Sequence, residues 1–476
     1  MIWGQLIWGA ILAGLLGCAF RRAWKWEHGA AAEVLFGEKN GRETFILVPP
    51  TVLFWILLLF LVLYVCFFGM REGLVHFAAL AAEVTLLICV YFPLLLLLLP
   101  LLRQHFSARA CAVLWLVPAF LTWQANMLIT VSPLPRLTLY LPRRLMPAIG
   151  AVWLAGFLAV GGCYLVSHLR FRAWVRRHSV AEREGEAWAI LKREQEALDY
   201  LRPVKLLRAG VPAPFSMGKT RRSRCTVLPK RHYTAQELSM IFRHELHHLQ
   251  RCDVDTKTFL CLCNALCWFH PLVWLATKKA SEDLERSCDE IVTEEMEEAE
   301  RRAYANLLLD AAAPGRGFTT CLSAAAGTLR YRLKSVMDRR RRSLGTAILM
   351  ASLFVCVMCF GLVSVSDARG SFTSLLLTPG TEILNAYDSR IPGEKQLDAE
   401  ALREVLEGIE LTHIAGLRRP LVKEQERITF RLSGGRFAAL TDRVLLLQDL
   451  RRASLYECYL VRSPIDWEAL RACCRS

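Results

Sequence analysis

Six long apolar runs alternate with charged segments along this chain of 476 residues. They cover residues 2–20, 45–68, 77–102, 110–131, 148–167 and 344–365. Each run approaches or exceeds about 20 residues, the length that a helix needs to cross the hydrocarbon core of a bilayer. The pattern therefore predicts a mainly α, polytopic helical membrane protein, with five transmembrane helices in residues 1–168 and a sixth in residues 344–365. No basic segment precedes the first run, so we expect a retained span there and not a cleaved signal peptide.

Composition agrees with that prediction, because 54% of the residues are hydrophobic and the mean hydropathy is +0.30. Lysine and arginine cluster after the first run, between the third and fourth, after the fifth and before the sixth. Such clusters tend to stay on the cytoplasmic side, which predicts that both termini lie outside. Arg136, Arg143 and Arg144 are exceptions. The net charge of +15 then reflects contact with the lipid bilayer, and no direct nucleic-acid binding is expected, because the basic residues are not gathered on one domain.

Residues 169–343, between the fifth and sixth runs, are long enough for one cytoplasmic domain. Residues 244–248 read His-Glu-Leu-His-His, and we expect them on a helix whose start is capped by Thr234 and Glu237. Positions i and i+4 share a helix face, so His244 and His248 can bind one Zn²⁺ ion, while Glu245 lies beside the water that the ion activates. His247 is interpreted as a flanking or solvent-facing residue. For the bare motif, a charged face of an ordinary helix remains an alternative.

A second helical segment, Lys278 to Glu298, supplies the other expected site residues. A catalytic zinc takes three protein ligands and a water molecule, and Glu285 is the natural third ligand. Asp289, one helical turn later, would accept a hydrogen bond from a ligand histidine and orient it. Asp253, five residues after His248, is a second such acceptor, although a helix-end or surface charge is an equal alternative. The pattern predicts a zinc peptidase.

The apolar stretch Phe259 to Ala276 could be mistaken for a further span. A crossing there would place Glu285 and His244 on opposite sides of the membrane, so we expect a helical segment that returns to the same side. Either a membrane-dipping segment or a plain core helix satisfies this requirement. The 17 cysteines are mostly within apolar runs and are expected to act as small hydrophobic residues, with at most one disulfide in the C-terminal segment.

Several spaced motifs resemble one family. Between Pro214 and Val292 the chain resembles the zinc-protease domain of the BlaR/MecR family of membrane metallopeptidases, the antirepressor sensors of antibiotic resistance. The matching features are Pro214-Phe215 with Gly218, Leu228-Pro229, His244-Glu245 with His248, Asp253, Trp268-Phe269-His270-Pro271, and Glu285 with Cys288-Asp289-Glu290. The family more often has Asn at the position of His270.

The resemblance implies a gluzincin-type domain in which His244, His248 and Glu285 bind zinc and Glu245 is the general base. It also implies a sensor that cleaves itself, a winged-helix transcriptional repressor, or both, with a homodimer as a possible assembly. No Ser-x-x-Lys occurs in residues 366–476, so sensing of β-lactams by acylation is not expected. An HtpX-like membrane quality-control protease and a non-catalytic sensor scaffold remain the alternatives.

The C-terminal segment, residues 366–476, is predicted to be a small extracytoplasmic α+β domain. Periodicity there predicts a helix over Ala399–Glu410 and a closing helix over Asp466–Ala472. Strand-like stretches cover 427–432, 437–447 and 456–461, with a turn at Gly434-Gly435. A ligand-sensing or partner-binding module and an inert cap are both compatible with this pattern.

Overall fold

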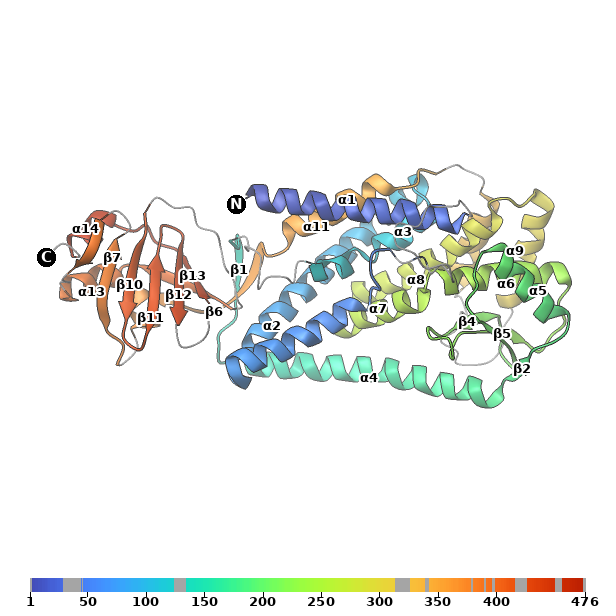
Figure 1. The fold of residues 1–476 in the computed structure, drawn as a ribbon, viewed down its shortest axis with the longest axis horizontal. Helices are drawn as coiled ribbons and strands as arrows, with labels where there is room; N and C mark the ends of the chain where they lie inside the picture. The colour runs from blue at the N-terminus through green and yellow to red at the C-terminus, as the bar shows by residue number, and fades with distance from the viewer. Residues whose placement is uncertain are drawn as a thin grey trace.

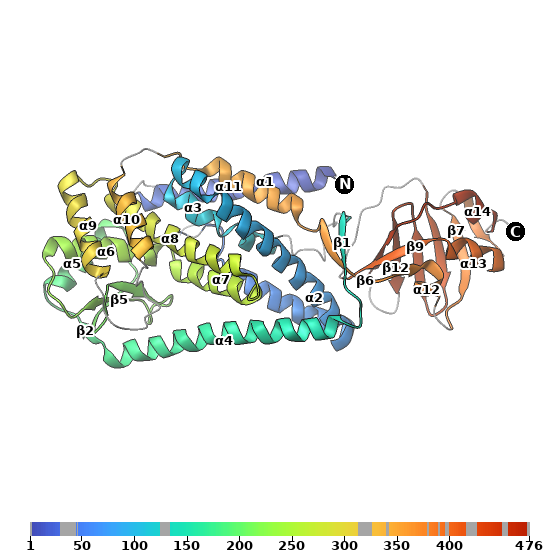
Figure 2. The same ribbon diagram turned by 180° about the vertical axis from the view of Figure 1, so that it is seen from behind.

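The computed structural model shows a long helical bundle with a different domain at each end (Figure 1). It describes residues 2–28, 44, 46–123, 134–312, 326–338, 342–377, 380–388, 391–395, 399–415, 426–449 and 456–473. The candidate peptidase region lies at one end of the bundle and a β-sheet domain at the other (Figures 1 and 2). The chain is thus mostly helical, with a mixed sheet domain.

Four helices in the described residues are long and apolar enough to cross a membrane. They are Gln5–Glu27 of α1 (Ile2–Glu27), Val52–Met70 and Glu72–His105 of α2 (Val52–His105), and Met146–His178, which is α4. The two parts of α2 meet at a kink at Gly69, which has a φ of 79° that favours glycine. These helices correspond to the predicted spans 1, 2, 3 and 5, and they support a membrane protein.

The predicted fourth span, residues 110–131, is wrong over its described part. The chain instead forms the short helix α3 (Ala108–Leu114) and the 3₁₀ helix η1 (Val117–Trp123); residues 124–131 lie outside the described part. All residues of α3 are buried, and the indole of Trp115 donates a hydrogen bond of 2.9 Å to Asp283. Irregular backbone at membrane depth is tolerated where protein surrounds it, so an apolar run that packs inside the bundle has no need to form one continuous helix.

The predicted sixth span is shorter than expected. Helix α11 covers Thr346–Cys359, and residues 363–365 already belong to strand β6 (Val363–Ser371). Helix α11 packs along α1. Strand β6 pairs in parallel with β1 (Leu137–Tyr140), which comes from the segment before α4, so the sheet domain is connected to the bundle by two parts of the chain.

The candidate peptidase region combines a small sheet with a group of helices. The sheet order is β2-β3-β5-β4, with β4 at one edge. The strands are β2 (Val180–Glu182), β3 (Lys205–Ala209), β4 (Phe215–Met217) and β5 (Cys225–Pro229), and the helices are α5 (Glu186–Ala197), α6 (Ala235–Gln250), α7 (Asp253–Leu266), α8 (Pro271–Thr293), α9 (Glu298–Ala312) and α10 (Ala326–Met337).

Helices α7 and α8 form a hairpin where the sequence suggested one apolar segment. The break lies between Leu266 and Pro271, because proline is well tolerated in the first turn of a helix. The tip packs against α4: Trp153 donates a hydrogen bond of 2.9 Å to the Leu266 carbonyl, and Trp268 donates one of 3.2 Å to the Trp153 carbonyl. The chain therefore returns toward its starting point, and α8 reaches the same site as α6.

The C-terminal domain is built on a nine-stranded sheet of order β1-β6-β9-β13-β12-β11-β10-β7-β8. Helices α12, α13 and α14 contribute Phe372, Leu402, Leu406 and Leu470 to its core. The two predicted helices and the Gly434-Gly435 turn are present, and the predicted stretch 437–447 is two strands, β11 and β12. The bounds are β7 (Ile383–Asp388), β8 (Ile391–Lys395), β9 (Glu410–Ile414), β10 (Ile428–Leu432), β11 (Arg436–Leu440), β12 (Val444–Asp449), β13 (Tyr456–Val461), α12 (Phe372–Leu376), α13 (Ala399–Glu407) and α14 (Trp467–Ala472).

No disulfide joins two of the described cysteines. The predicted upper limit of one disulfide therefore concerns Cys474 as well, which lies outside the described residues.

Candidate metal centre

Helix α6 carries the His-Glu-x-x-His motif on its buried half. The predicted capping box is present: the Glu237 carboxylate accepts from the Thr234 amide at 2.7 Å, and the Thr234 hydroxyl accepts from the Glu237 amide at 3.3 Å. Ten residues after this cap, His244, Glu245 and His248 are between 5% and 8% exposed. A defined helix start therefore fixes the rotation at which the motif faces the interior.

Three candidate ligand atoms converge from α6 and α8. The Nε2 atoms of His244 and His248 are 3.1 Å apart, and each lies 3.5 Å from Oε2 of Glu285. Zinc binds histidine and carboxylate ligands at about 2.0–2.2 Å in a tetrahedral arrangement, which places ligand atoms about 3.3 Å from one another. The triangle formed by His244, His248 and Glu285 therefore has the size that a tetrahedral metal ion requires.

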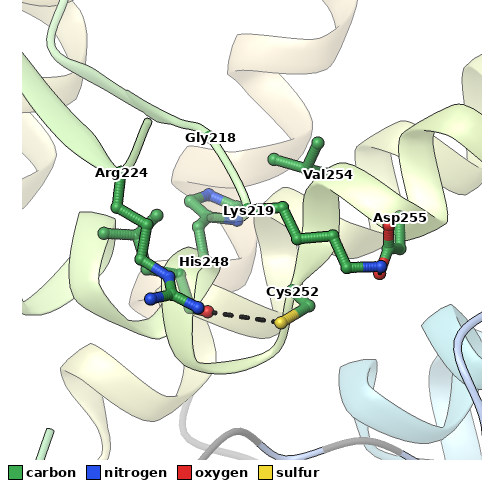
Figure 3. A pocket seen from close by; sticks show the side chains of 8 residues that line it. Gly218, Lys219, Arg224, His248, Cys252, Val254 and Asp255 are labelled. Atoms are coloured by element: carbon green, nitrogen blue, oxygen red, sulfur yellow. Dashed lines mark hydrogen bonds and ion pairs between the residues drawn. The ribbon is translucent and has the colours of Figure 1, made fainter. Parts of the chain in front are cut away.

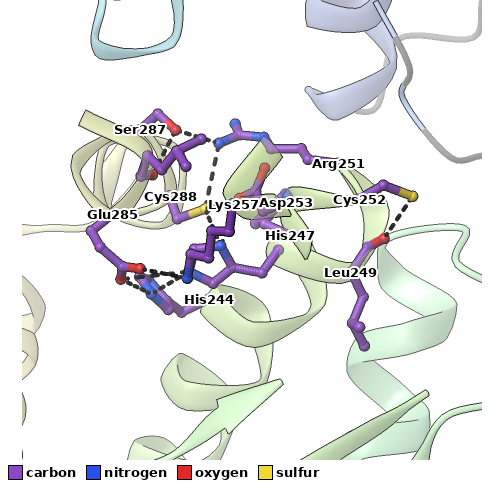
Figure 4. Close-up of polar contacts among 12 residues, drawn as sticks. His244, His247, Leu249, Arg251, Cys252, Asp253, Lys257, Glu285, Ser287 and Cys288 are labelled. Atoms are coloured by element: carbon purple, nitrogen blue, oxygen red, sulfur yellow. Dashed lines mark hydrogen bonds and ion pairs between the residues drawn. The ribbon is translucent and has the colours of Figure 1, made fainter. Parts of the chain in front are cut away.

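The two carboxylate oxygens of Glu285 face different groups, Oε1 toward Lys257 and Oε2 toward the two histidines. Its Oε1 lies 3.3 Å from Nζ of Lys257, while its buried Oε2 has no hydrogen-bond partner among the described residues (Figure 4). Burial opposes ionisation, but the charges of His248 and Lys257 and the contacts with both histidines hold the pKa of Glu285 well below its usual range. A buried anionic oxygen that faces two imidazoles without a donor fits a metal ligand.

His248 is supported by its own neighbourhood in the chain. Asp253, at the first turn of α7, accepts a hydrogen bond of 2.7 Å from Nδ1 of His248. Cys252 allows this approach, because its left-handed conformation (φ 54°) turns the chain between α6 and α7. The bond holds the proton at Nδ1, so that Nε2 of His248, directed at the candidate metal position, would be the atom that binds a metal.

A second possible metal group consists of His248, Asp253 and Cys288. It would use Nδ1 of His248, the atom already hydrogen-bonded to Asp253. The first group instead uses Nε2 of both histidines of the motif, the atoms that their hydrogen-bonded Nδ1 atoms leave available. We therefore regard the first group as the metal centre.

His244 is supported by residues from three other helices. Its Nδ1 lies 3.0 Å from the hydroxyl of Tyr304 on α9 and 3.4 Å from Oδ1 of Asp289 on α8. The Tyr304 hydroxyl donates to Asp289 at 2.8 Å. Arg332 on α10 donates two hydrogen bonds, of 2.7 and 2.6 Å, to the same carboxylate. Asp289 therefore lies where the sequence placed it. Arg332 was not predicted as a site residue, because its spacing in the sequence does not relate it to the other site residues.

Tyr304 and Tyr331 carry no spacing signal in the sequence, and the structure brings only Tyr304 to a candidate ligand, His244. Tyr331 has no such contact and instead accepts a hydrogen bond of 2.7 Å from Arg286. Lys257 was also missed, although its position four residues after Asp253 on α7 could have suggested a place on the same helix face.

His247 is buried, at 3% exposure, so it is not solvent-facing. It is absent from the candidate ligand group, in agreement with the alternative of a flanking residue. Its Nδ1 contacts Gln250, and burial together with the charge of Arg251 holds the pKa of His247 well below its usual range. It faces away from the metal triangle toward the bundle. There Arg251 forms a buried ion pair of 2.8 Å with Glu27 at the end of α1.

A small pocket opens beside His248, between the loop after β4 and the turn from α6 to α7 (Figure 3). Lys219 and Asp255 form an ion pair of 2.8 Å at its rim. Gly218 has a φ of 92°, and a Cβ there would come within 2.0 Å of the Ser223 carbonyl oxygen, so only glycine fits this wall. The lining residues are Gly218, Lys219, Arg224, His248, Leu249, Cys252, Val254 and Asp255.

Comparison with known proteins agrees with this geometry. Residues 137–336 match the family described as BlaR1 peptidase M56. The curated Regulatory protein BlaR1 of Bacillus licheniformis is 28% identical over 165 residues, which are 34% of this chain and 27% of that protein. The match thus spans about a quarter of the relative's length. Both findings confirm the predicted BlaR/MecR-type resemblance, and residues 137–336 are the part of the chain that matches the BlaR1 peptidase M56 family.

Proposed function

We propose that this protein is a membrane-embedded zinc endopeptidase that acts as a signal-transducing antirepressor. The observation that carries the proposal is the triangle of His244, His248 and Glu285, in which a buried carboxylate oxygen that accepts no hydrogen bond from the described residues faces both imidazoles. Membership of a peptidase family implies a metal, and the two histidines with one carboxylate favour zinc among the common ions.

Zinc bound to His244, His248 and Glu285 would supply Lewis acidity toward a water molecule and the scissile carbonyl. Glu245 follows the first ligand directly, so its buried carboxylate is placed to take a proton from the attacking water and pass it to the leaving amine. Asp253 and Asp289 keep the imidazoles in the orientation that directs Nε2 inward. Lys257 holds Oε1 of Glu285, which leaves Oε2 for the metal.

The pocket beside His248 offers a place for a side chain of the substrate next to the scissile bond. Strand β4 forms the edge of the small sheet and packs against α6, so an extended peptide could approach the site along it. We propose a protein substrate on this basis, either a winged-helix repressor or a segment of this chain.

A regulatory role fits the two connections between the sheet domain and the bundle. Strand β6 continues from α11, and α11 packs along α1, whose last residue, Glu27, pairs with Arg251 beside the motif. We propose that the sheet domain lies outside the cell and the peptidase region in the cytoplasm, as the basic clusters predict. The relative is named a regulatory protein, which favours this role over general quality control.

The test is an immunoblot of the tagged chain in cells that also carry a repressor encoded beside its gene. We expect fragments of the repressor or of the chain in the wild type and none in Glu245→Gln. Glu196→Gln is the matched control, because it makes the same chemical change on an exposed residue of α5.

Three other results would contradict the proposal, and each would indicate a different alternative. Fragments that persist in Glu245→Gln would assign the cleavage to another protease. Cleavage of many unrelated membrane proteins would indicate the quality-control alternative. Absence of fragments under several cell-wall stresses, with zinc bound in the purified protein, would indicate the scaffold alternative.

A further inference from the structure

Helix α10 is the last described helix before α11, and it contacts the candidate metal centre through one side chain. Arg332 is only 8% exposed and forms a two-pronged pair with Asp289. Its third nitrogen, Nη1, lies 3.5 Å from Oε2 of Glu285, the oxygen that faces both histidines. One guanidinium on α10 thus touches both carboxylates that α8 contributes to the site.

The contact extends to His244 through atoms whose roles are defined. Asp289 accepts two hydrogen bonds from Arg332 and one from the Tyr304 hydroxyl, so Tyr304 has no proton left for His244. The Tyr304 oxygen must then accept from Nδ1 of His244. That arrangement requires the tautomer with a free Nε2, which is the form that binds a metal.

The position of Arg332 depends on the docking of α10 against α8. Besides the contacts of Arg332, two hydrogen bonds join the helices: Arg286 donates to Tyr331 at 2.7 Å and to Ser335 at 2.8 Å. Beyond α10, Ser343 forms a parallel bridge to Phe106 just before α11 begins. A displacement of α10 along with α11 would therefore withdraw the guanidinium from Asp289 and Glu285.

We propose that Arg332 is a positioning residue that makes zinc affinity depend on the docking of α10. The proposal rests on the proposed zinc site. With α10 docked, Arg332 neutralises and fixes Asp289, and Asp289 with Tyr304 fixes His244. With α10 displaced, a buried carboxylate loses its partner and the ligand loses its orientation. Because coupling between two equilibria is reciprocal, zinc binding must in turn strengthen the docking of α10.

The experiment uses the full chain in lipid nanodiscs, with zinc affinity measured by competition with a chelator. Partners that orient a ligand histidine are typically worth 10- to 100-fold in metal affinity, so we expect Arg332→Gln to lose about tenfold. Arg332→Lys keeps the charge but not the two-pronged geometry, and we expect it to recover part of the loss. Arg330→Gln, an exposed arginine on the same helix, should retain wild-type affinity.

Amide hydrogen exchange of residues 326–337 supplies the second readout. Zinc should slow exchange there in the wild type and have little effect in Arg332→Gln. Unchanged zinc affinity in folded Arg332→Gln would overturn the proposal. The proposal would also be overturned if amide exchange in α10 of the wild type were the same with and without zinc. If Arg332→Gln does not fold, the same criteria apply to Arg332→Lys. A wild-type protein that binds no zinc would instead refute the proposed function.

Discussion

The two histidines of the metal centre are held in different ways. His248 is oriented by Asp253, only five residues later in the chain, at a distance of 2.7 Å. His244 is oriented by Tyr304 and Asp289, which come from two other helices and are fixed by Arg332 from a third. One half of the site therefore forms with the turn between α6 and α7, whereas the other half forms only when α8, α9 and α10 are packed together.

This difference suggests where regulation can act. A change in the packing of α8, α9 and α10 leaves Asp253 beside His248 and weakens the His244 half. Helix α10 precedes α11 in the chain, so the His244 half has a connection toward the sheet domain that is separate from the Glu27–Arg251 pair on the His248 side.

The largest expected effect comes from Asp289→Ala. This change leaves the buried guanidinium of Arg332 without its partner, and removal of one member of a buried ion pair typically costs about 3–5 kcal/mol. We expect a corresponding fall in the free energy of unfolding of the metal-free protein, measured by denaturant titration in detergent. Asp310→Ala, on the exposed face of α9, should stay within about 0.5 kcal/mol of the wild type. A loss below 1 kcal/mol for Asp289→Ala would contradict the importance of the distant half.

An intermediate effect is expected for Asp253→Asn. The substitution keeps the size of the side chain but removes the charge that orients His248, so zinc affinity should fall by about tenfold. Hydrogen exchange of α10 in the metal-free protein should not change, because Asp253 makes no hydrogen bond or ion pair with the described residues of α10. If exchange in α10 rises as much as in Arg332→Gln, the two halves of the site are not separable.

The smallest effect is expected for Tyr304→Phe. The ring stays buried and only one hydroxyl is lost, and a single hydrogen bond contributes about 1 kcal/mol, or roughly fivefold in affinity. Zinc affinity measured beside that of Tyr233→Phe, a half-buried tyrosine at the start of α6, would isolate the contribution of this hydroxyl. A loss of a hundredfold or more would show that the Tyr304 oxygen does more than orient His244.

The sequence predicted those parts of the site that helical spacing governs. His244 and His248 share a face, and Glu285 and Asp289 lie one turn apart, so periodicity alone placed them in pairs. Asp253 followed from its closeness to His248 in the chain. Arg332 lies 84 residues after His248, and no periodicity connects a residue on α10 with one on α6. For Tyr304, the sequence does not show whether the hydroxyl faces a metal ligand.

The fold was predictable to a similar degree. Alternating apolar residues and the Gly434-Gly435 pair predicted the regions of β10 to β13, but not those of β6 to β9. Hydrophobicity could not distinguish residues 110–123 from a lipid-facing helix, because protein and lipid interiors are equally apolar. Burial of His247 was missed because the sequence does not show that other parts of the protein cover this face of α6.

The pairing of β1 with β6 sets an order of events during synthesis. Leu137 is made about 220 residues before its partner Val363, which corresponds to roughly 10–45 s of translation. Throughout that time the edge formed by Leu137–Tyr140 lacks its strand partner, and unpaired strand edges invite wrong association. The peptidase region is completed before the sheet can accept β1. Newly made chains therefore pass through an interval in which the peptidase region is complete and its connection to the C-terminal domain has not yet formed.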